Sequence, residues 1–282
     1  MRDYIKRFIS SAVKTAECLS ADEHCAKGII LLYHSIGAAD RSDYLKLRVD
    51  NDSFNRQMEY LREKKYNVVP LTELINKLNS GAEMRGQKFI SLTFDDGYAD
   101  NLEFAAPVLK KYGFSAAVFI TTGYLDGRGR GDNYWDKWGY LTTENIRELV
   151  SFGFEIGSHS CSHRLLISLD DIGLRREISD SKKALEGTAK NKVTLFSYPH
   201  GAFNKRVENI LKEEGYIAAC TSITGFNDDK SNMLELRRIE IRSGDSLRDF
   251  INKINGHYNW LGHFQKMRSL KDGCGSGKNR KD

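Results

Sequence analysis

Short apolar runs alternate with longer amphipathic stretches along most of this chain. The runs are rich in β-branched and aromatic residues, as buried strands are, and lie at 29–33, 89–93, 116–121, 154–157, 194–198 and 216–220. Between the runs, apolar residues recur at helical spacing, which predicts helices at 53–64, 71–79, 102–112, 143–152, 169–186 and 205–214. This order predicts parallel strands covered by helices, and a (β/α) barrel with fewer than eight clear units is the natural closure.

Two adjacent carboxylates, Asp95 and Asp96, follow the apolar run at 89–93 directly. Burying a carboxylate requires a compensating partner, and a metal ion is a common one. The pair His159 and His163 follows another predicted strand, so two imidazoles and one carboxylate could bind a metal and leave one position open for water. The second carboxylate would then serve as the base. The plainer alternatives are an Asp-Asp-Gly turn and two surface histidines one helical turn apart.

The candidate residues share a position relative to the predicted strands. Each of them comes immediately after a strand, and the set is His34, Asp95, Asp96, His159, His163 and His200. In (β/α) barrels the chemistry gathers in the loops at the carboxyl ends of the strands. The predicted fold therefore supports a catalytic site independently of any single motif.

Three segments resemble motifs of the polysaccharide deacetylases, the NodB-homology proteins of carbohydrate esterase family four. They are Thr93-Phe94-Asp95-Asp96-Gly97, His159-Ser160-Cys161-Ser162-His163 and Phe196-Ser197-Tyr198-Pro199-His200-Gly201. The resemblance covers about 28–241 and implies a distorted, incomplete α/β barrel of about seven parallel strands. It also implies that Asp95 is the general base and that Asp96, His159 and His163 bind the metal.

The third motif departs from the family pattern. Tyr198 stands where many members carry an arginine that holds the base, and Arg237 or Arg238 could replace that arginine. His200 follows Pro199 where the family usually has Tyr or Phe. Backbone N–H groups near Tyr198, Pro199 and His200 could still stabilise the oxyanion.

The general acid is expected at His34. The segment Leu31-Leu32-Tyr33-His34 resembles the Leu-x-Tyr-His motif that comes first in one branch of the family, which includes exopolysaccharide N-deacetylases. A group that titrates near neutral pH suits protonation of a leaving amine. The alternative is a strand-end histidine that is hydrogen-bonded to a backbone carbonyl.

Substrate contacts are expected in the glycine-rich loop at 124–138, which could act as a lid. Trp135 could stack on a sugar ring, although it could equally anchor the loop to the barrel. The resemblance implies hydrolysis of the N-acetyl group of an amino sugar, and Zn²⁺ is the expected metal, with Co²⁺ or another transition metal possible. The alternatives are hydrolysis of a formamide or cyclic amide on a small molecule and a non-catalytic carbohydrate-binding protein.

Composition adds bounds to this picture. The 282 residues, 40% of them hydrophobic, suffice for one large core at 25–262, and no apolar stretch is long enough to span a membrane. Five cysteines without a Cys-x-x-Cys pair suggest reduced thiols and a cytoplasmic protein. The net charge of +5 comes partly from a basic tail at 263–282, which is expected to be disordered, and no nucleic-acid-binding module is recognised.

The first 24 residues predict a basic amphipathic helix, which could contact the inner face of a membrane or pack on its own domain. A cytoplasmic enzyme of this kind would act on a precursor of a surface polysaccharide. The expected substrate is a nucleotide-linked, lipid-linked or oligosaccharide amino sugar, and the sequence gives no oligomeric state.

Overall fold

Seven strands form the centre of the protein in a computed structural model that describes residues 27–38, 40, 43–80, 87–127, 137–262 and 265. They all pair in parallel, and they are β1 (Lys27–Tyr33), β5 (Lys88–Phe94), β6 (Ala117–Ile120), β7 (Glu155–Ser158), β8 (Leu195–Ser197), β9 (Ala218–Thr224) and β10 (Leu236–Glu240). β1 pairs with both β5 and β10, which closes the ring. The predicted barrel of about seven parallel strands is confirmed.

The sequence pattern missed β10 and three two-residue strands. β10 carries Arg237, Arg238 and Glu240 among its five residues, so it lacks the apolar run of a buried strand. The short strands are β2 (Ser35–Ile36), β3 (Arg48–Val49) and β4 (Asn67–Val68). β2 pairs with β3 outside the barrel, whereas β4 adds to the amino-terminal half of β5.

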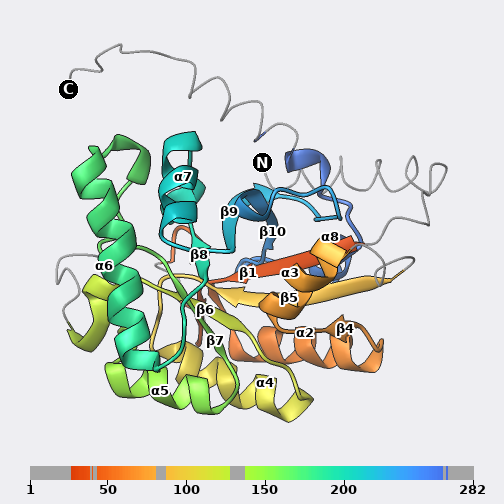
Figure 1. The fold of residues 1–282 in the computed structure, drawn as a ribbon. Coiled ribbons are helices and arrows are strands. Elements are labelled where there is room, and N and C mark those ends of the chain that lie inside the picture. Colours follow the sequence, from red (N-terminus) through yellow and green to blue (C-terminus); the bar gives the residue numbers. More distant parts are fainter. Residues whose placement is uncertain are drawn as a thin grey trace.

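Helices surround the strands, and most lie where the apolar spacing predicts them (Figure 1). The α-helices are α2 (Asn51–Glu63), α3 (Leu71–Ser80), α4 (Ala106–Tyr112), α5 (Thr143–Ser151), α6 (Asp171–Ala189), α7 (Lys205–Glu213) and α8 (Leu247–Ile254). A π-helical turn, η1 (Asn101–Ala105), precedes α4, so the helix predicted at 102–112 is two segments of different geometry. The short 3₁₀ segments are η2 (Thr122–Gly127), η4 (Leu166–Ser168), η5 (Pro199–Gly201) and η6 (Met233–Glu235).

The strands divide their side chains between two apolar clusters because successive residues point to opposite faces. In β5, Ile90, Leu92 and Phe94 belong to the larger cluster, which the surrounding helices cover, whereas Phe89 belongs to the smaller one. The smaller cluster fills the barrel interior and includes four residues of α3: Leu71, Leu74, Ile75 and Leu78. α3 therefore closes the amino-terminal end of the barrel and leaves the carboxyl end for chemistry.

Glu155 fixes α3 in that place. Its carboxylate accepts hydrogen bonds from the backbone N–H groups of Leu71 (2.6 Å) and Thr72 (3.0 Å), and it also contacts the Thr72 hydroxyl. These N–H groups belong to the first turn of the helix and have no partner within it. A negative charge at that end is also favourable for the helix dipole.

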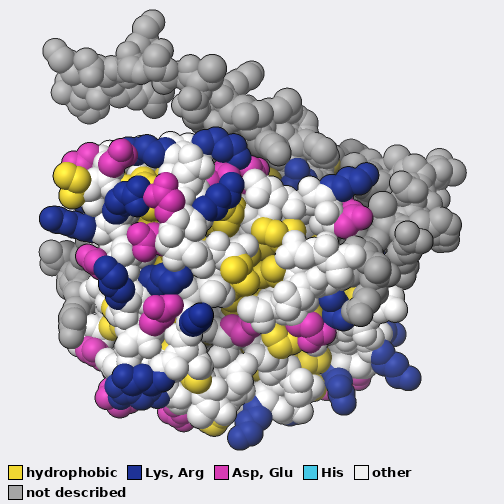
Figure 2. All heavy atoms as spheres, in the orientation of Figure 1, with side chains coloured by type: hydrophobic (Ala, Val, Ile, Leu, Met, Phe, Trp, Pro, Cys, Tyr) yellow, Lys and Arg dark blue, Asp and Glu magenta, His cyan; other side chains and the backbone are white. Residues whose placement is uncertain are grey.

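Several predictions fall on residues that the structure does not describe. These are the amphipathic helix at 1–24, Trp135 in the glycine-rich loop, and the tail at 263–282 apart from Gln265. Among the described residues, no helix is long and apolar enough to cross a membrane. The molecular face in Figure 2 carries basic and acidic side chains side by side, with small apolar areas between them.

Candidate active site

Five polar side chains point into the barrel at its carboxyl end. His34 and Asp95 directly follow β1 and β5, His159 follows β7, Ser197 ends β8, and Arg238 lies within β10. The alternation of side chains along each strand directs them to the interior face, where the smaller apolar cluster lies closer to α3. All of them except His34 are buried. Residues far apart in the sequence thus meet at one end of the barrel.

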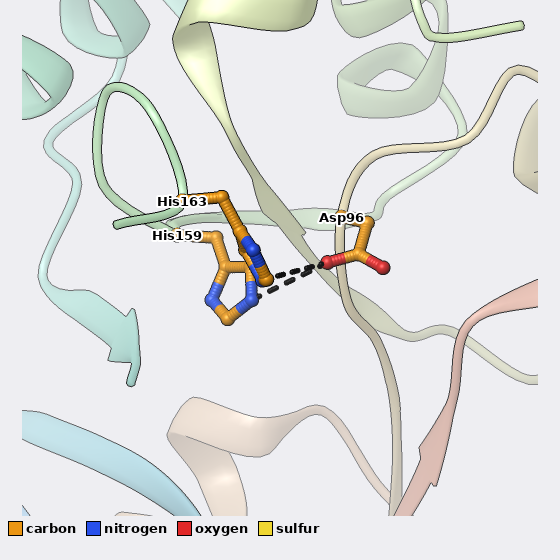
Figure 3. A group of neighbouring side chains, drawn as sticks. All are labelled: Asp96, His159 and His163. Atoms are coloured by element: carbon orange, nitrogen blue, oxygen red, sulfur yellow. Dashed lines mark ion pairs between the residues drawn. The ribbon is translucent and has the colours of Figure 1, made fainter. Parts of the chain in front are cut away.

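Asp96, His159 and His163 form a group that could bind a metal ion (Figure 3). The Nε2 atoms of both histidines lie 3.4 Å from Oδ1 of Asp96, and the ligand atoms of all three residues lie within 4.8 Å of one another. Asp96 and His163 both have positive φ angles, 72° and 56°, which non-glycine residues adopt at a cost. The loops therefore hold an unfavourable backbone conformation that aims these side chains at one point.

The orientation of His159 fits a metal ligand. Its Nδ1 lies 2.7 Å from the carbonyl oxygen of Ser197, which fixes Nδ1 as the protonated nitrogen. The lone pair of Nε2 then faces Asp96. A histidine that binds metal usually donates its other N–H to such an oxygen, which holds the ring in place. Two imidazoles and a carboxylate are also the donor set of catalytic zinc sites.

The electrostatics of the three residues suit cation binding. Burial lowers the pKa of His163 to about 4, so its ring is neutral, as a metal ligand must be. Burial alone would raise the pKa of Asp96, but His159 and His163 outweigh it and hold the carboxylate in its charged form. Burial would likewise lower the pKa of His159, but Asp95 and Asp96 raise it. The two neighbouring carboxylates thus outweigh the effect of burial on the pKa of His159.

A glutamate that sequence reasoning missed supports the loop between the two histidines. Glu177 of α6 accepts hydrogen bonds from the backbone N–H groups of Cys161 and Ser162, both at 2.9 Å, and one from the Ser162 hydroxyl. Within the loop, the His163 N–H donates to the Ser160 hydroxyl at 3.0 Å. These bonds hold the turn that places His163 opposite Asp96. Glu177 lies in α6, fourteen positions after His163, and nothing in the sequence distinguishes it from a surface glutamate of that helix.

The base candidate Asp95 is only 3% exposed and is held by an arginine. Arg238 donates two parallel hydrogen bonds to it, at 2.8 Å and 2.7 Å, and Ser197 donates a third at 3.0 Å. Of the two arginines considered from the sequence, Arg238 is therefore the one that meets the carboxylate. Burial would raise the pKa of Asp95, but Arg238 and His159 outweigh it and keep the pKa below its usual value. Asp95 is thus poised as a charged acceptor.

His34 directly follows β1 and is half-buried. It is close enough to Asp95 and Asp96 to lower the pKa of both. Its Nδ1 is buried and has no hydrogen-bond partner among the described residues. The alternative of a strand-end histidine held by a carbonyl at this nitrogen therefore finds no support.

The third motif places its residues differently. Tyr198 is 1% exposed, its hydroxyl donates to the Leu234 carbonyl at 3.0 Å, and its N–H donates to the Cys220 carbonyl at 3.1 Å. Its side chain belongs to the core, and its N–H is bonded to Cys220, so neither can contact an oxyanion. Pro199 has no N–H, which leaves His200 as the candidate oxyanion donor of this motif. The exposed His200 ring also packs against His163, with ring centroids 4.5 Å apart.

A parallel barrel whose carboxyl end carries an Asp-His-His group able to bind a metal is the arrangement expected of a metal-dependent barrel hydrolase. Residues 82–219 match the model of the polysaccharide deacetylase family. The chain is 31% identical, over 79% of its own length and 75% of the relative's, to YxkH of Bacillus subtilis (strain 168), which is provisionally named a polysaccharide deacetylase. The chain belongs to the polysaccharide deacetylase family, whose hydrolases act on N-acetyl groups.

Two further similarities agree with this family. The chain is 24% identical, over 74% of its length and 73% of the relative's, to the poly-β-1,6-N-acetyl-D-glucosamine N-deacetylase of Staphylococcus aureus (strain MSSA476). The deacetylase PplD of Streptococcus pyogenes, solved in complex with acetate, superimposes with a TM-score of 0.72 at 25% identity. That superposition covers 82% of this chain and 99% of PplD. The shared fold therefore covers most of this chain.

Proposed function

We propose that this protein is a metal-dependent deacetylase that hydrolyses the N-acetyl group of an amino sugar. The observation that carries the proposal is the arrangement of two adjacent carboxylates, with Asp96 facing His159 and His163 and Asp95 facing Arg238. This arrangement separates a metal ligand from a base within one turn. The relatives named as deacetylases support the same reaction.

The residues of the site divide the proton transfers. A divalent metal held by Asp96, His159 and His163 would polarise the acetyl carbonyl and favour ionisation of water. Asp95 accepts the proton of the attacking water, because Arg238 and Ser197 hold it charged and oriented. Zn²⁺ suits the donor set best, although other transition metals accept the same ligands.

His34 is the proposed proton donor to the leaving amine. It delivers a proton to the nitrogen of the amino sugar as the carbon–nitrogen bond breaks, and its half-exposed position lets it regain a proton from solvent. The ring of His200 packs against His163, and its backbone N–H would donate to the oxyanion that develops on the acetyl group. Trp135, which lies outside the described residues, would contact the sugar.

The substrate is proposed to contain N-acetylglucosamine, because one relative is named for poly-β-1,6-N-acetyl-D-glucosamine. We place the reaction in the cytoplasm, on a nucleotide-linked, lipid-linked or oligosaccharide precursor of a surface polysaccharide. The free thiols of Cys161 and Cys220 suit a reducing compartment. Contact of the first 24 residues with the membrane would favour the lipid-linked form.

Hydrolysis of a panel of substrates, followed by the new carboxylate that each one yields, tests the proposal. The panel contains N-acetylglucosamine oligomers, UDP-linked and polyprenyl-linked N-acetylglucosamine, an N-formyl amino sugar and a cyclic amide. We expect activity on the N-acetyl compounds that disappears with a chelator and returns with Zn²⁺ or Co²⁺. Preferred hydrolysis of the formamide or cyclic amide would favour the other carbon–nitrogen hydrolase. Sugar binding without turnover in the metal-loaded protein would indicate a carbohydrate-binding protein.

A further inference from the structure

The segment that follows His34 is tied to the loop that follows the base. Asp100 accepts hydrogen bonds from the Ser35 hydroxyl at 2.6 Å and from the Ile36 N–H at 3.1 Å. The neighbouring Asn101 donates to the carbonyl oxygen of His34 at 2.8 Å. Three consecutive residues are thus held by two others, and Asp100 lies only five positions after Asp95.

Arg48 completes this network from the opposite side. Its guanidinium donates to Asp100 at 2.7 Å and to the Ser35 hydroxyl at 2.6 Å, and its Nε donates to the Ala38 carbonyl at 3.1 Å. A Cβ at Gly37 would lie 1.9 Å from the guanidinium, so a larger residue there would require the Arg48 side chain to shift. Asp100 therefore binds both the segment after His34 and the charged side chain of Arg48.

The ring of His34 lacks a comparable anchor. Its Nδ1 is buried and makes no hydrogen bond within the described part of the chain. In His159, by contrast, a carbonyl fixes the same nitrogen. Since no bond to Nδ1 orients the His34 ring, its position depends on the backbone from which it extends. That backbone is the segment held by Asp100 and Asn101.

We propose that Asp100, together with Arg48, is a positioning residue that sets the distance between the acid His34 and the base Asp95. The proposal rests on the function proposed above, in which His34 protonates the leaving amine. Asp95 and Asp100 belong to the same loop and helix start, so a shift of one carries the other with it. Catalysis by proton transfer requires hydrogen-bond reach, and a displacement of about 1 Å is enough to slow it.

The burial of Asp100 supports a role beyond stability. Asp100 is 2% exposed, and burial raises its pKa to about 6, although Ser35, Ile36 and Arg48 oppose the rise. The folded protein therefore holds a charged carboxylate at neutral pH in a place where the charge is unfavourable. Groups retained at such a cost concentrate at functional sites.

The test compares two substrates that differ in their need for an acid. An N-acetylglucosamine oligomer has an amine leaving group that must be protonated, whereas 4-nitrophenyl acetate releases a phenolate that leaves without a proton. We expect Asp100→Asn to lower kcat on the oligomer about 10- to 100-fold with little change in KM. Hydrolysis of the aryl ester should change less than about twofold, and the metal content should equal that of the wild type, because Asp95 and the ligands are untouched.

Glu155→Gln is the matched control. Glu155 also accepts backbone and hydroxyl hydrogen bonds from a distant segment, but it does so at the closed end of the barrel. This variant should hydrolyse both substrates at rates close to the wild type. His34→Ala should reproduce the selective loss of Asp100→Asn. If Asp100→Asn slows both substrates in parallel, or slows neither, the positioning role is refuted.

A second variant with a smaller change tests the proposal even if the Asp100→Asn protein does not fold. Ser35→Ala keeps the Arg48–Asp100 ion pair and removes the hydroxyl that donates to Asp100 and accepts from Arg48. We expect the same selective loss, reduced to about three- to tenfold. A parallel loss on both substrates, or no loss, would again refute the positioning role. A wild-type protein that hydrolyses the ester but no N-acetyl sugar would instead refute the proposed function, independently of Asp100.

Discussion

The proposed base and the proposed acid of this site are held in opposite ways. Asp95 is held through its side chain, because Arg238 and Ser197 donate hydrogen bonds to its carboxylate oxygens and only 3% of the residue is exposed. His34 is half-exposed, its Nδ1 has no hydrogen-bond partner among the described residues, and its backbone is held instead. A charged group must be compensated where it is buried, whereas an acid that regains its proton from bulk solvent must be partly exposed.

The difference separates stability from activity. Arg238 and Ser197 stabilise the buried charge of Asp95, so removing either of them should lower the free energy of unfolding of the barrel. The ring of His34 makes no described hydrogen bond through Nδ1, so its removal should affect the reaction far more than the fold. Variants on the two sides of the site should therefore behave differently in unfolding and in turnover experiments.

Arg238→Met should have the largest effect on stability. It leaves the Asp95 carboxylate buried without a counter-charge, and such losses cost about 3–5 kcal/mol. Urea unfolding of the metal-free protein measures this cost. Adding Asp95→Asn to Arg238→Met removes the stranded charge and should restore part of the free energy of unfolding. Equal stability of the single and double variants would show that the ion pair does not carry the difference.

His34→Ala should show the reverse profile. The free energy of unfolding should fall by less than about 1 kcal/mol, because no described hydrogen bond of Nδ1 is lost. Turnover of an N-acetylated amino sugar should fall about 100-fold, since general acid catalysis is removed. Unfolding curves and steady-state rates on the same preparations give both values. A large loss of stability with normal turnover would reverse the comparison.

Ser197→Ala should have a smaller effect that reaches only the base. The hydroxyl donates to Asp95 and accepts from Arg238 at 2.9 Å, so its loss should cost about 1 kcal/mol. The Ser197 carbonyl that holds His159 remains, and the metal content should not change. Metal analysis together with urea unfolding checks both statements. Loss of metal in this variant would mean that the hydroxyl supports the ligand side as well.

The sequence predicted the parts of the site that stand directly at strand ends. Asp95, Asp96 and His159 follow apolar runs, and the alternation of a strand determines which of their side chains turn inward. Six barrel strands were predicted for the same reason, because a strand buried on both faces needs a continuous apolar run.

Residues that act through tertiary contact were not predictable in this way. Arg238 lies in β10, where charged residues interrupt the apolar pattern, so neither the strand nor the choice between Arg237 and Arg238 could be settled. Glu177 and Asp100 lie on helical segments and reach the site only because the chain folds back on itself. Tyr198 was considered near the oxyanion, yet packing against Phe203 and the rest of the core determines where its ring lies.

The adjacent aspartates provide the most direct test of the central claim, the division between a base and a metal ligand. Metal content and acetate release should be measured together on Asp95→Asn and Asp96→Asn after loading with Zn²⁺. We expect Asp95→Asn to retain one metal per chain while turnover falls about 1,000-fold or more, because only the proton acceptor is lost. Asp96→Asn should lose the metal itself. A metal-free Asp95→Asn protein beside a fully loaded and inactive Asp96→Asn protein would contradict the account.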